Sequence, residues 1–447
     1  MQMKQRIYLK NQDLTLGSFV VSPAEDTPFA SLPLHAYRVS ELGFNTELPP
    51  GAFPPELRVV LHGEEEPKSR ALRLLLSERL YANRWHMREM LQHLATSGQQ
   101  ATLPDLVAAT HLVSLNDTYW FDTAELRWEK ISPYRNLWRE DLSALAWNAE
   151  ELDFHSGCRI SPELATNGVL KKCWQQREDG IVLSKGDQFS TAPGSLNQVS
   201  MEFVASEVAK AMQLPSYVPY ILKWQETCAV EDRTAAGGAP GRDPLAEEVC
   251  SLGGEIACEC PLFCDERRGY LPAWRYLRSD PMLEERASPF DEDGQRAIAA
   301  TLGEEAYADL MIFDSVIANG DRHLGNFGAL VDNLTGELLA LAPIFDNGYS
   351  ALLQNWYRED WLCADPELFA DLPGRFLSCN DAVACFGQPR HRPYLERVVD
   401  FELDQSTLPE QCRLTDKVVT ALNTLIRVRA RTALELIKDS HLSLNLP

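Results

Sequence analysis

The spacing of apolar residues changes twice along this chain, and it divides the sequence into three stretches. In the first, short runs of β-like composition lie between turns that contain proline and glycine, and a longer segment then repeats leucine and methionine at helical spacing. We predict strands over 6–9, 18–21 and 57–61, helix over 69–96 and 104–111, and an Asn-Asp turn leading into an aromatic strand over 114–121. No catalytic motif occurs before residue 155, so 1–154 is predicted to be an α+β accessory region.

The second stretch, 155–280, is rich in β-like segments. We predict strands over 181–186, 217–224, 256–263 and 270–276, the last two as a hairpin or as edge strands, and a helix over 198–212. Residues 226–248 are mostly small or polar. Because such a segment buries little apolar surface, we predict a mobile surface insertion there.

The third stretch, 281–447, is mainly helical. We predict a helix over 304–318 that ends at Asn319-Gly320, a hairpin formed by 329–331 and 338–344, and a long amphipathic helix over 414–437. Arg427, Arg429 and Arg431 in the last helix are interpreted as a solvated polar face rather than a binding patch.

Overall charge and hydropathy disfavour some classes of function. The 447 residues carry a formal net charge of −23, which argues against direct, sequence-independent nucleic-acid binding and against docking on anionic membranes. No apolar run approaches the length of a membrane span, and the N-terminal residues lack the pattern of a signal peptide. The expectation is a cytoplasmic protein without a membrane partner.

The eleven cysteines are scattered and odd in number, which is typical of reduced thiols. Cys250, Cys258, Cys260 and Cys264 cluster locally. They suggest either a zinc site or a strand whose alternate residues 258 and 260 face one side. The absence of a CxxC pair favours the strand.

The residues that indicate chemistry lie in 319–326 and 343–348. Asp321 follows a predicted helix end, in a loop where its carboxylate can orient a hydroxyl nucleophile. Asn326 and Asp346 offer oxygen ligands for Mg²⁺, which bridges the phosphates of ATP. Ordinary surface turns explain each of these pieces separately, but not an Asp, an Asn five residues later and an Asp behind a hairpin. The set predicts a phosphoryl-transfer site.

Two further residues near this set are predicted to shape the backbone of the site rather than to take part in the reaction. His323 is interpreted as a scaffold that fixes its loop by hydrogen bonds, in preference to direct chemistry. Gly348 is expected to give the chain conformational freedom next to the metal.

A lysine from the β-rich stretch completes the predicted site. Lys185 ends a strand and is the candidate for the α- and β-phosphates, with Lys171 and Lys172 as competitors. Glu202 either pairs with Lys185 or is an exposed helical residue. Thr166-Asn167-Gly168 is a tight turn whose backbone N–H groups and hydroxyl can cradle phosphate. A β-rich half with a lysine, followed by a helical half with carboxylates, is the order of a two-lobed kinase.

These motifs resemble the HipA-like serine/threonine kinases, a bacterial family typified by the kinases of toxin–antitoxin systems. The matching pieces are 166–174, Lys185-Gly186, 197–206, 321–326 and 342–348. The resemblance implies a two-lobed α+β kinase fold, with 155–280 as N-lobe and 281–447 as C-lobe, and ATP and Mg²⁺ as cofactors.

By the same resemblance Asp321 would be the catalytic base, Asn326 and Asp346 the magnesium ligands, and Lys185 the ATP lysine. It also implies autophosphorylation, with Ser161 or Thr166 as acceptor, a protein substrate and an antitoxin-like regulator. The segment 114–120 and the helical region before the core depart from the best-known members.

Two other hypotheses remain open. Asp-Arg-His followed by Asn also resembles the catalytic loop of phosphatidylinositol kinases, so a lipid or small-molecule kinase is the first alternative. The second is a pseudokinase that binds nucleotide, or a partner through 1–150, without turnover.

Overall fold

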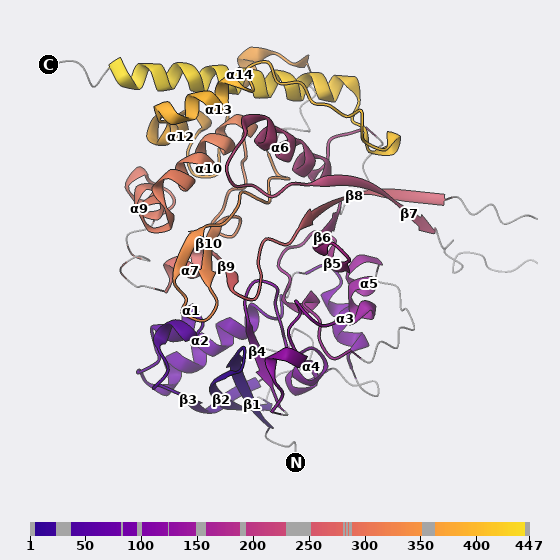
Figure 1. The fold of residues 1–447 in the computed structure, drawn as a ribbon, viewed down its shortest axis with the longest axis vertical. Helices are drawn as coiled ribbons and strands as arrows, with labels where there is room; N and C mark the ends of the chain where they lie inside the picture. The colour runs from indigo at the N-terminus through magenta and orange to yellow at the C-terminus, as the bar shows by residue number, and fades with distance from the viewer. Residues whose placement is uncertain are drawn as a thin grey trace, which may run out of the picture.

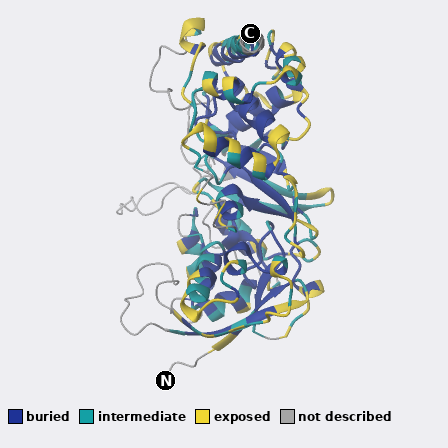
Figure 2. Cartoon of the chain, turned by 90° about the vertical axis from the view of Figure 1, so that its left-hand side faces the viewer, coloured by how far each residue is buried: buried dark blue, intermediate teal, exposed yellow. Residues whose placement is uncertain are grey.

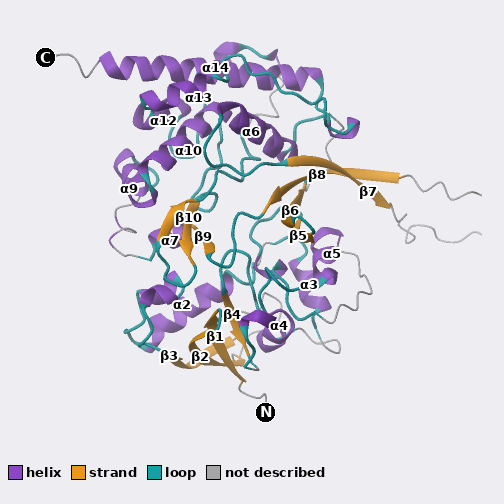
Figure 3. Ribbon diagram, viewed as in Figure 1, coloured by secondary structure: helices purple, strands orange, loops and turns teal. Residues whose placement is uncertain are grey.

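The structure is a computed structural model that describes residues 5–23, 37–81, 84–95, 101–123, 125–148, 158–187, 194–228, 252–279, 282, 285, 288–350 and 363–442. Its three parts follow one another along the long axis (Figure 1): the N-terminal region at one end, a sheet beside the middle, and the C-terminal helices at the other end. The molecule combines strands in its N-terminal and middle parts with helices that gather at the C-terminal end (Figure 3), so the predicted α+β class is confirmed.

The N-terminal region is built on an antiparallel sheet of order β3-β2-β1-β4. Its elements are β1 (Gln5–Asn11), β2 (Leu14–Pro23), β3 (Tyr37–Phe44), α1 (Pro55–Arg58), α2 (Glu65–Ser77), α3 (Met87–His93), α4 (Leu103–Thr110), β4 (Tyr119–Asp122) and α5 (Glu140–Asn148). Ile7 and Leu9 alternate toward one buried core, which they share with the apolar face of α2.

Two predictions for this region are wrong. Residues 57–61 do not form a strand, because Pro55 stands at the first position of a helix, where its missing N–H and fixed φ are tolerated. The helical spacing over 69–96 belongs to two helices, α2 and α3, rather than to one.

The second part contains the antiparallel sheet β5-β6-β8-β7. Its elements are β5 (Lys172–Arg177), β6 (Gly180–Gly186), α6 (Gln198–Met212), β7 (Ile221–Cys228), β8 (Leu252–Pro261), β9 (Arg268–Pro272) and α7 (Ala273–Leu277). For 256–263 and 270–276 the hairpin alternative is wrong, and the edge-strand alternative holds for β9 but not for β8. Strand β8 lies inside this sheet, β9 pairs with β10 in another one, and 273–277 is helical. The predicted insertion, 226–248, lies outside the described residues from 229 onward.

The third part is helical apart from a hairpin, which forms the sheet β11-β10-β9 with β9. Its elements are α9 (Glu292–Leu302), α10 (Glu304–Ile317), β10 (Gly328–Asp332), β11 (Leu338–Leu341), α12 (Cys379–Phe386), α13 (Arg392–Glu396) and α14 (Asp416–Leu442). Helix α6 shares its core with these helices and not only with its own sheet. In Figure 2 the buried positions run through the middle of all three parts.

The predicted solvated face of α14 is wrong for Arg429, which is fully buried. Its guanidinium donates to the backbone oxygens of Ser315 and Ala370 and to Asn380 Oδ1. These partners lie 49 to 114 residues away in sequence, so the pattern within α14 alone does not reveal them.

Candidate nucleotide-binding and phosphoryl-transfer site

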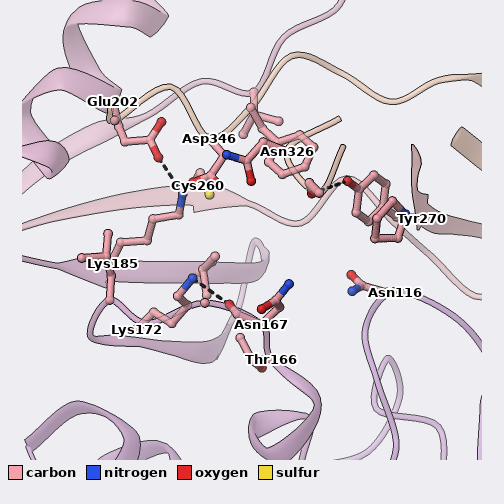
Figure 4. A pocket seen from close by; sticks show the side chains of 18 of the residues that line it. Asn116, Thr166, Asn167, Lys172, Lys185, Glu202, Cys260, Tyr270, Asn326 and Asp346 are labelled. Carbon is pink, nitrogen blue, oxygen red and sulfur yellow. Dashed lines mark hydrogen bonds and ion pairs between the residues drawn. The ribbon is translucent and has the colours of Figure 1, made fainter. Parts of the chain in front are cut away.

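A cavity of about 320 Å³ lies where the three parts meet, and it is lined by residues of all three. Lys185 and Glu202 lie at one end of the view in Figure 4, Asn326 and Asp346 above the cavity, and the turn at Thr166 and Asn167 below it. All the predicted site residues, 166–168, 185, 202, 321, 323, 326 and 346, line this cavity. Its volume lies at the lower end of the range for small-molecule sites.

Lys185 lies at the centre of a buried charge cluster. It comes from β6, and its ammonium is 2.6 Å from Glu202 Oε1 and 2.9 Å from Asp346 Oδ1. Burial works to lower the pKa of Lys185, but Asp346 and Glu202 hold that pKa well above its ordinary value. The lysine therefore stays charged. The pairing of Glu202 with Lys185, which the sequence left open, is formed.

Asp346 occupies an unusual backbone position. Its φ is +57°, in the left-handed region that non-glycine residues seldom adopt. Burial works to raise the pKa of its carboxyl, yet the Lys185 and Lys172 ammonium groups hold that pKa well below its ordinary range. The carboxylate is thus ionised and available to a cation.

The prediction that Gly348 supplies backbone freedom is wrong. It is Asp346, not Gly348, that has a positive φ. A Cβ on Gly348 would lie 2.8 Å from the backbone oxygen of Gln198 and 3.3 Å from Glu202 Cγ. Glycine is needed there because the chain passes against the start of α6.

Arg322 connects the two motifs, and the sequence interpretation missed it. Its guanidinium forms a bidentate pair with buried Asp314 of α10, at 2.9 and 3.0 Å. Its Nη1 also donates to the backbone oxygens of Asn326 and Phe345, both at 2.7 Å. One buried arginine therefore holds the loop of Asp321 against the segment of Asp346. The sequence did contain a signal for this pair, because Asp314 lies among apolar residues of the predicted helix over 304–318 and a buried carboxylate needs a partner.

Asp321 follows the end of α10, and its carboxyl is partly buried. Burial raises the pKa of Asp321, and the nearby Asp346 carboxylate adds to that effect, while His323 opposes it. His323 Nδ1 accepts a hydrogen bond from the Gly325 N–H at 2.9 Å, which agrees with the scaffold interpretation. A carboxylate with a raised pKa is a better proton acceptor.

Asn326 donates its side-chain amide to the backbone oxygen of Asp321 at 2.9 Å. The amide nitrogen is thereby held inside the protein, and Oδ1 is the atom that can coordinate a cation. With the Asp346 carboxylate it forms an all-oxygen donor set, which fits Mg²⁺ completed by phosphate oxygens and water.

The turn below Lys185 is held by a second lysine. Lys172 Nζ donates to the Asn167 backbone oxygen at 2.8 Å. A Cβ on Gly168, whose φ is +108°, would lie 2.3 Å from that Nζ, so glycine lets the ammonium approach. Burial lowers the pKa of Lys172 to about 8, and the Lys185 charge contributes. Its competitor Lys171 instead pairs with Glu255 at 2.5 Å, outside the cavity.

The two candidate autophosphorylation sites are buried. Ser161 Oγ accepts from the Glu163 N–H, and Thr166 Oγ1 donates to the Pro162 oxygen while accepting from Trp174 Nε1. Thr166 lines the cavity, but its hydroxyl is held by the protein. Phosphorylation of either residue would require this loop to move.

Between the charged end and the accessory region the cavity wall becomes apolar and aromatic. Phe263, Tyr270 and Phe345 contact one another with ring centroids 5.4–5.6 Å apart, and Leu183 lines the same cavity. Aromatic and aliphatic walls beside a cationic end suit a planar base that carries phosphates.

The zinc interpretation receives no support within the described ranges. Cys258 and Cys260 lie in β8 and are buried, and Cys250 is not described. No group of three or more His, Cys, Asp or Glu side chains that could hold a metal ion occurs among the described residues. No described helix is long and apolar enough to cross a membrane.

No protein-family model matches the sequence, and no curated protein matches it. Among solved structures, the proinflammatory kinase CtkA of Helicobacter pylori is similar at 16% identity and a TM-score of 0.41, over 64% of this chain and 96% of its own. HipA of Shewanella oneidensis MR-1, solved with HipB and operator DNA, is similar at 13% identity and a TM-score of 0.47, over 97% and 99%. Both similarities are at low sequence identity and at TM-scores below 0.5.

Proposed function

We propose that this protein is an ATP- and Mg²⁺-dependent kinase that transfers the γ-phosphate of ATP to a serine or threonine hydroxyl of a protein. The observation that carries the proposal is the buried Lys185, bonded at once to Glu202 and to Asp346, in a cavity that Asp321 and Asn326 also line. Phosphoryl transfer consists mainly of positioning and charge neutralisation, and this cavity offers the groups for both.

In this proposal the adenine lies against the aromatic wall and the phosphates extend toward Lys185. Lys185 binds the α- and β-phosphates, Glu202 positions that lysine, and Lys172 with the turn at Asn167 and Gly168 lies beneath the phosphate chain. Asn326 and Asp346 would hold Mg²⁺, which would supply positive charge to neutralise the phosphates.

Asp321 accepts the proton of the attacking hydroxyl. The new bond joins that oxygen to the γ-phosphorus, the bond from the γ-phosphorus to the bridging oxygen breaks, and ADP leaves. The parts 155–280 and 281–447 act as the two lobes around the nucleotide, and 1–154 as an accessory region. An antitoxin-like regulator stays a prediction, as does self-phosphorylation.

The test follows transfer of label from γ-labelled ATP with Mg²⁺ to the protein itself and to casein as a general acceptor. Asp321→Asn should lower the rate by about 10²- to 10⁴-fold, the usual contribution of a general base. Asp404→Asn, at an exposed turn outside the cavity, is the matched control and should keep the rate.

Equal labelling by wild type and Asp321→Asn would contradict the proposal. Phosphatidylinositol vesicles and small alcohols are supplied as further acceptors in parallel reactions. Label that appears only on them would favour the alternative substrate class. ATP binding without any turnover would identify a pseudokinase.

A further inference from the structure

The segment Ser114–Trp120 was the part of the accessory region that the predicted function left unexplained, and its side chains divide into two groups. Most of these side chains form hydrogen bonds with other groups of the protein. Ser114 Oγ accepts from the Asn116 N–H, Asp117 pairs with Arg79 at 2.5 Å, Thr118 Oγ1 donates to Asn11 Oδ1, and Trp120 Nε1 donates to the Gln12 oxygen.

The exception is Asn116. Its side chain lines the cavity and lies below Tyr270, across the cavity from Lys185 and Glu202 (Figure 4). Within the described part of the chain its carboxamide has no hydrogen-bond partner. An amide that a rigid loop holds at a cavity wall, without a protein partner, is available to a ligand.

The position of Asn116 is fixed by its own backbone. Its carbonyl oxygen accepts from the Tyr270 N–H at 2.6 Å, and the adjacent Leu115 oxygen accepts from the Tyr134 hydroxyl at 3.0 Å. The Tyr270 hydroxyl in turn donates to the Gly325 oxygen at 3.1 Å. The accessory loop is thereby attached to the aromatic wall of the cavity, at the end away from the phosphate-binding lysine.

We propose that Asn116 recognises the hydrogen-bonding edge of adenine, so that the accessory region selects the base of the nucleotide. This inference rests on the proposed function. A carboxamide presents one donor and one acceptor side by side, which matches the exocyclic amine and the neighbouring ring nitrogen of adenine. Guanine presents a carbonyl oxygen where adenine has its amine, and purine without the amine offers no donor.

The experiment compares the dissociation constants of ATP, GTP and purine riboside triphosphate for the full chain and for Asn116→Ala. We expect Asn116→Ala to reduce the preference for ATP over purine riboside triphosphate by roughly 10- to 100-fold, the discrimination typical of a bidentate amide contact. The variant keeps the backbone bonds to Tyr270 and Ser114, and a thermal melt confirms that it folds.

The matched control is Asn167→Ala, at the turn beneath the phosphates. It should weaken all three triphosphates by the same factor and leave their relative affinities unchanged. An unchanged base preference in Asn116→Ala, or an equal loss for all three nucleotides, overturns the inference while ATP binding by the wild type leaves the kinase proposal standing. A wild-type chain that binds no triphosphate overturns both.

Discussion

Two buried ion pairs of this protein are similar in chemistry but differ in how completely they are closed. At the joint between the accessory region and α7, Glu56 and Arg275 form a bidentate pair at 2.5 and 3.1 Å, and both side chains are at most 5% exposed. In the cavity, Lys185 is shared by Glu202 and Asp346, and the Asp346 side chain is 37% exposed. The Glu56–Arg275 pair is neutral and shielded from solvent. The cluster of Lys185 with two carboxylates has an excess negative charge and is partly open to solvent.

The difference shows how one kind of interaction serves two purposes. Burial works to raise the pKa of Glu56, but Arg275 brings that pKa below its ordinary value, and no further ligand is needed. The extra carboxylate in the cavity suits a divalent cation and the phosphates that accompany it. The joint therefore positions the accessory region, and the cavity stays ready for a charged ligand.

The largest effect is expected from Asp346→Asn. The change removes one negative charge and an oxygen proposed to bind Mg²⁺ from the cluster around Lys185 but keeps the size of the side chain. Phosphoryl transfer should fall on the order of 10⁴-fold, equivalent to about 5 kcal/mol of transition-state stabilisation. The measurement is the single-turnover rate with ATP and Mg²⁺. A rate within tenfold of wild type would show that the open carboxylate has no such role.

The second effect concerns the sealed pair. Arg275→Ala leaves the Glu56 carboxylate buried without its partner and should lower the free energy of unfolding by about 3–5 kcal/mol. Replacing both residues, as Glu56→Leu with Arg275→Met, should restore most of that stability. The measurement is denaturant unfolding.

The exposed pair of Arg296 with Glu292 provides the control for this experiment, because its side chains are 53% and 55% exposed. Arg296→Ala should cost less than about 1 kcal/mol. If Arg275→Ala costs no more than this control, the distinction between the sealed and the open pair is lost.

The smallest expected effect is a pH dependence of ATP affinity that arises from Lys172. Because the pKa of Lys172 lies at about 8, its charge is present below that pH and disappears above it. ATP affinity should therefore fall as pH rises from about 7.5 to 9, by at most about tenfold per pH unit. In Lys172→Arg, which stays charged, the fall should vanish. A wild-type affinity that is flat across this range would exclude Lys172 from the phosphate site.

The stability of the unliganded chain should depend on pH in the opposite direction from ATP affinity. The folded pKa of Lys172 is depressed below its ordinary value of 10.5, so the folded state releases its proton first. Stability from this residue should rise with pH between about 8 and 10.5.

The sequence predicted the elements whose signals are local. Helix α6 spans 198–212 as expected, because Asn197 and Ser200 form a capping box and apolar residues recur along the helix. The hairpin of β10 and β11 and the end of α10 also appeared where turn residues mark them. The residues of the proposed site could be predicted because phosphoryl transfer restricts their types and order, and the structure brings them to one cavity.

Other features depend on contacts that are distant in sequence. The burial of Arg429 depends on Ser315 and Ala370, and the role of Arg322 depends on Asp314 and Phe345. The aromatic wall combines Phe263, which follows β8, with Phe345, which precedes Asp346. Periodicity carries no information about such pairs, so the accessory region could be separated from the core in the sequence but not placed against the cavity.

The contact between Asn11 and the backbone oxygen of Asn333, 322 residues apart at 2.7 Å, has a consequence for biosynthesis. During translation the first strand must wait for the hairpin of β10 and β11 before this bond can form. Asp321 precedes this hairpin in the chain and Asp346 follows it, so the hairpin emerges between the two carboxylates. Attachment of the first strand to this hairpin is therefore a late event, and a nascent chain truncated before the hairpin would leave the Asn11 amide without this partner.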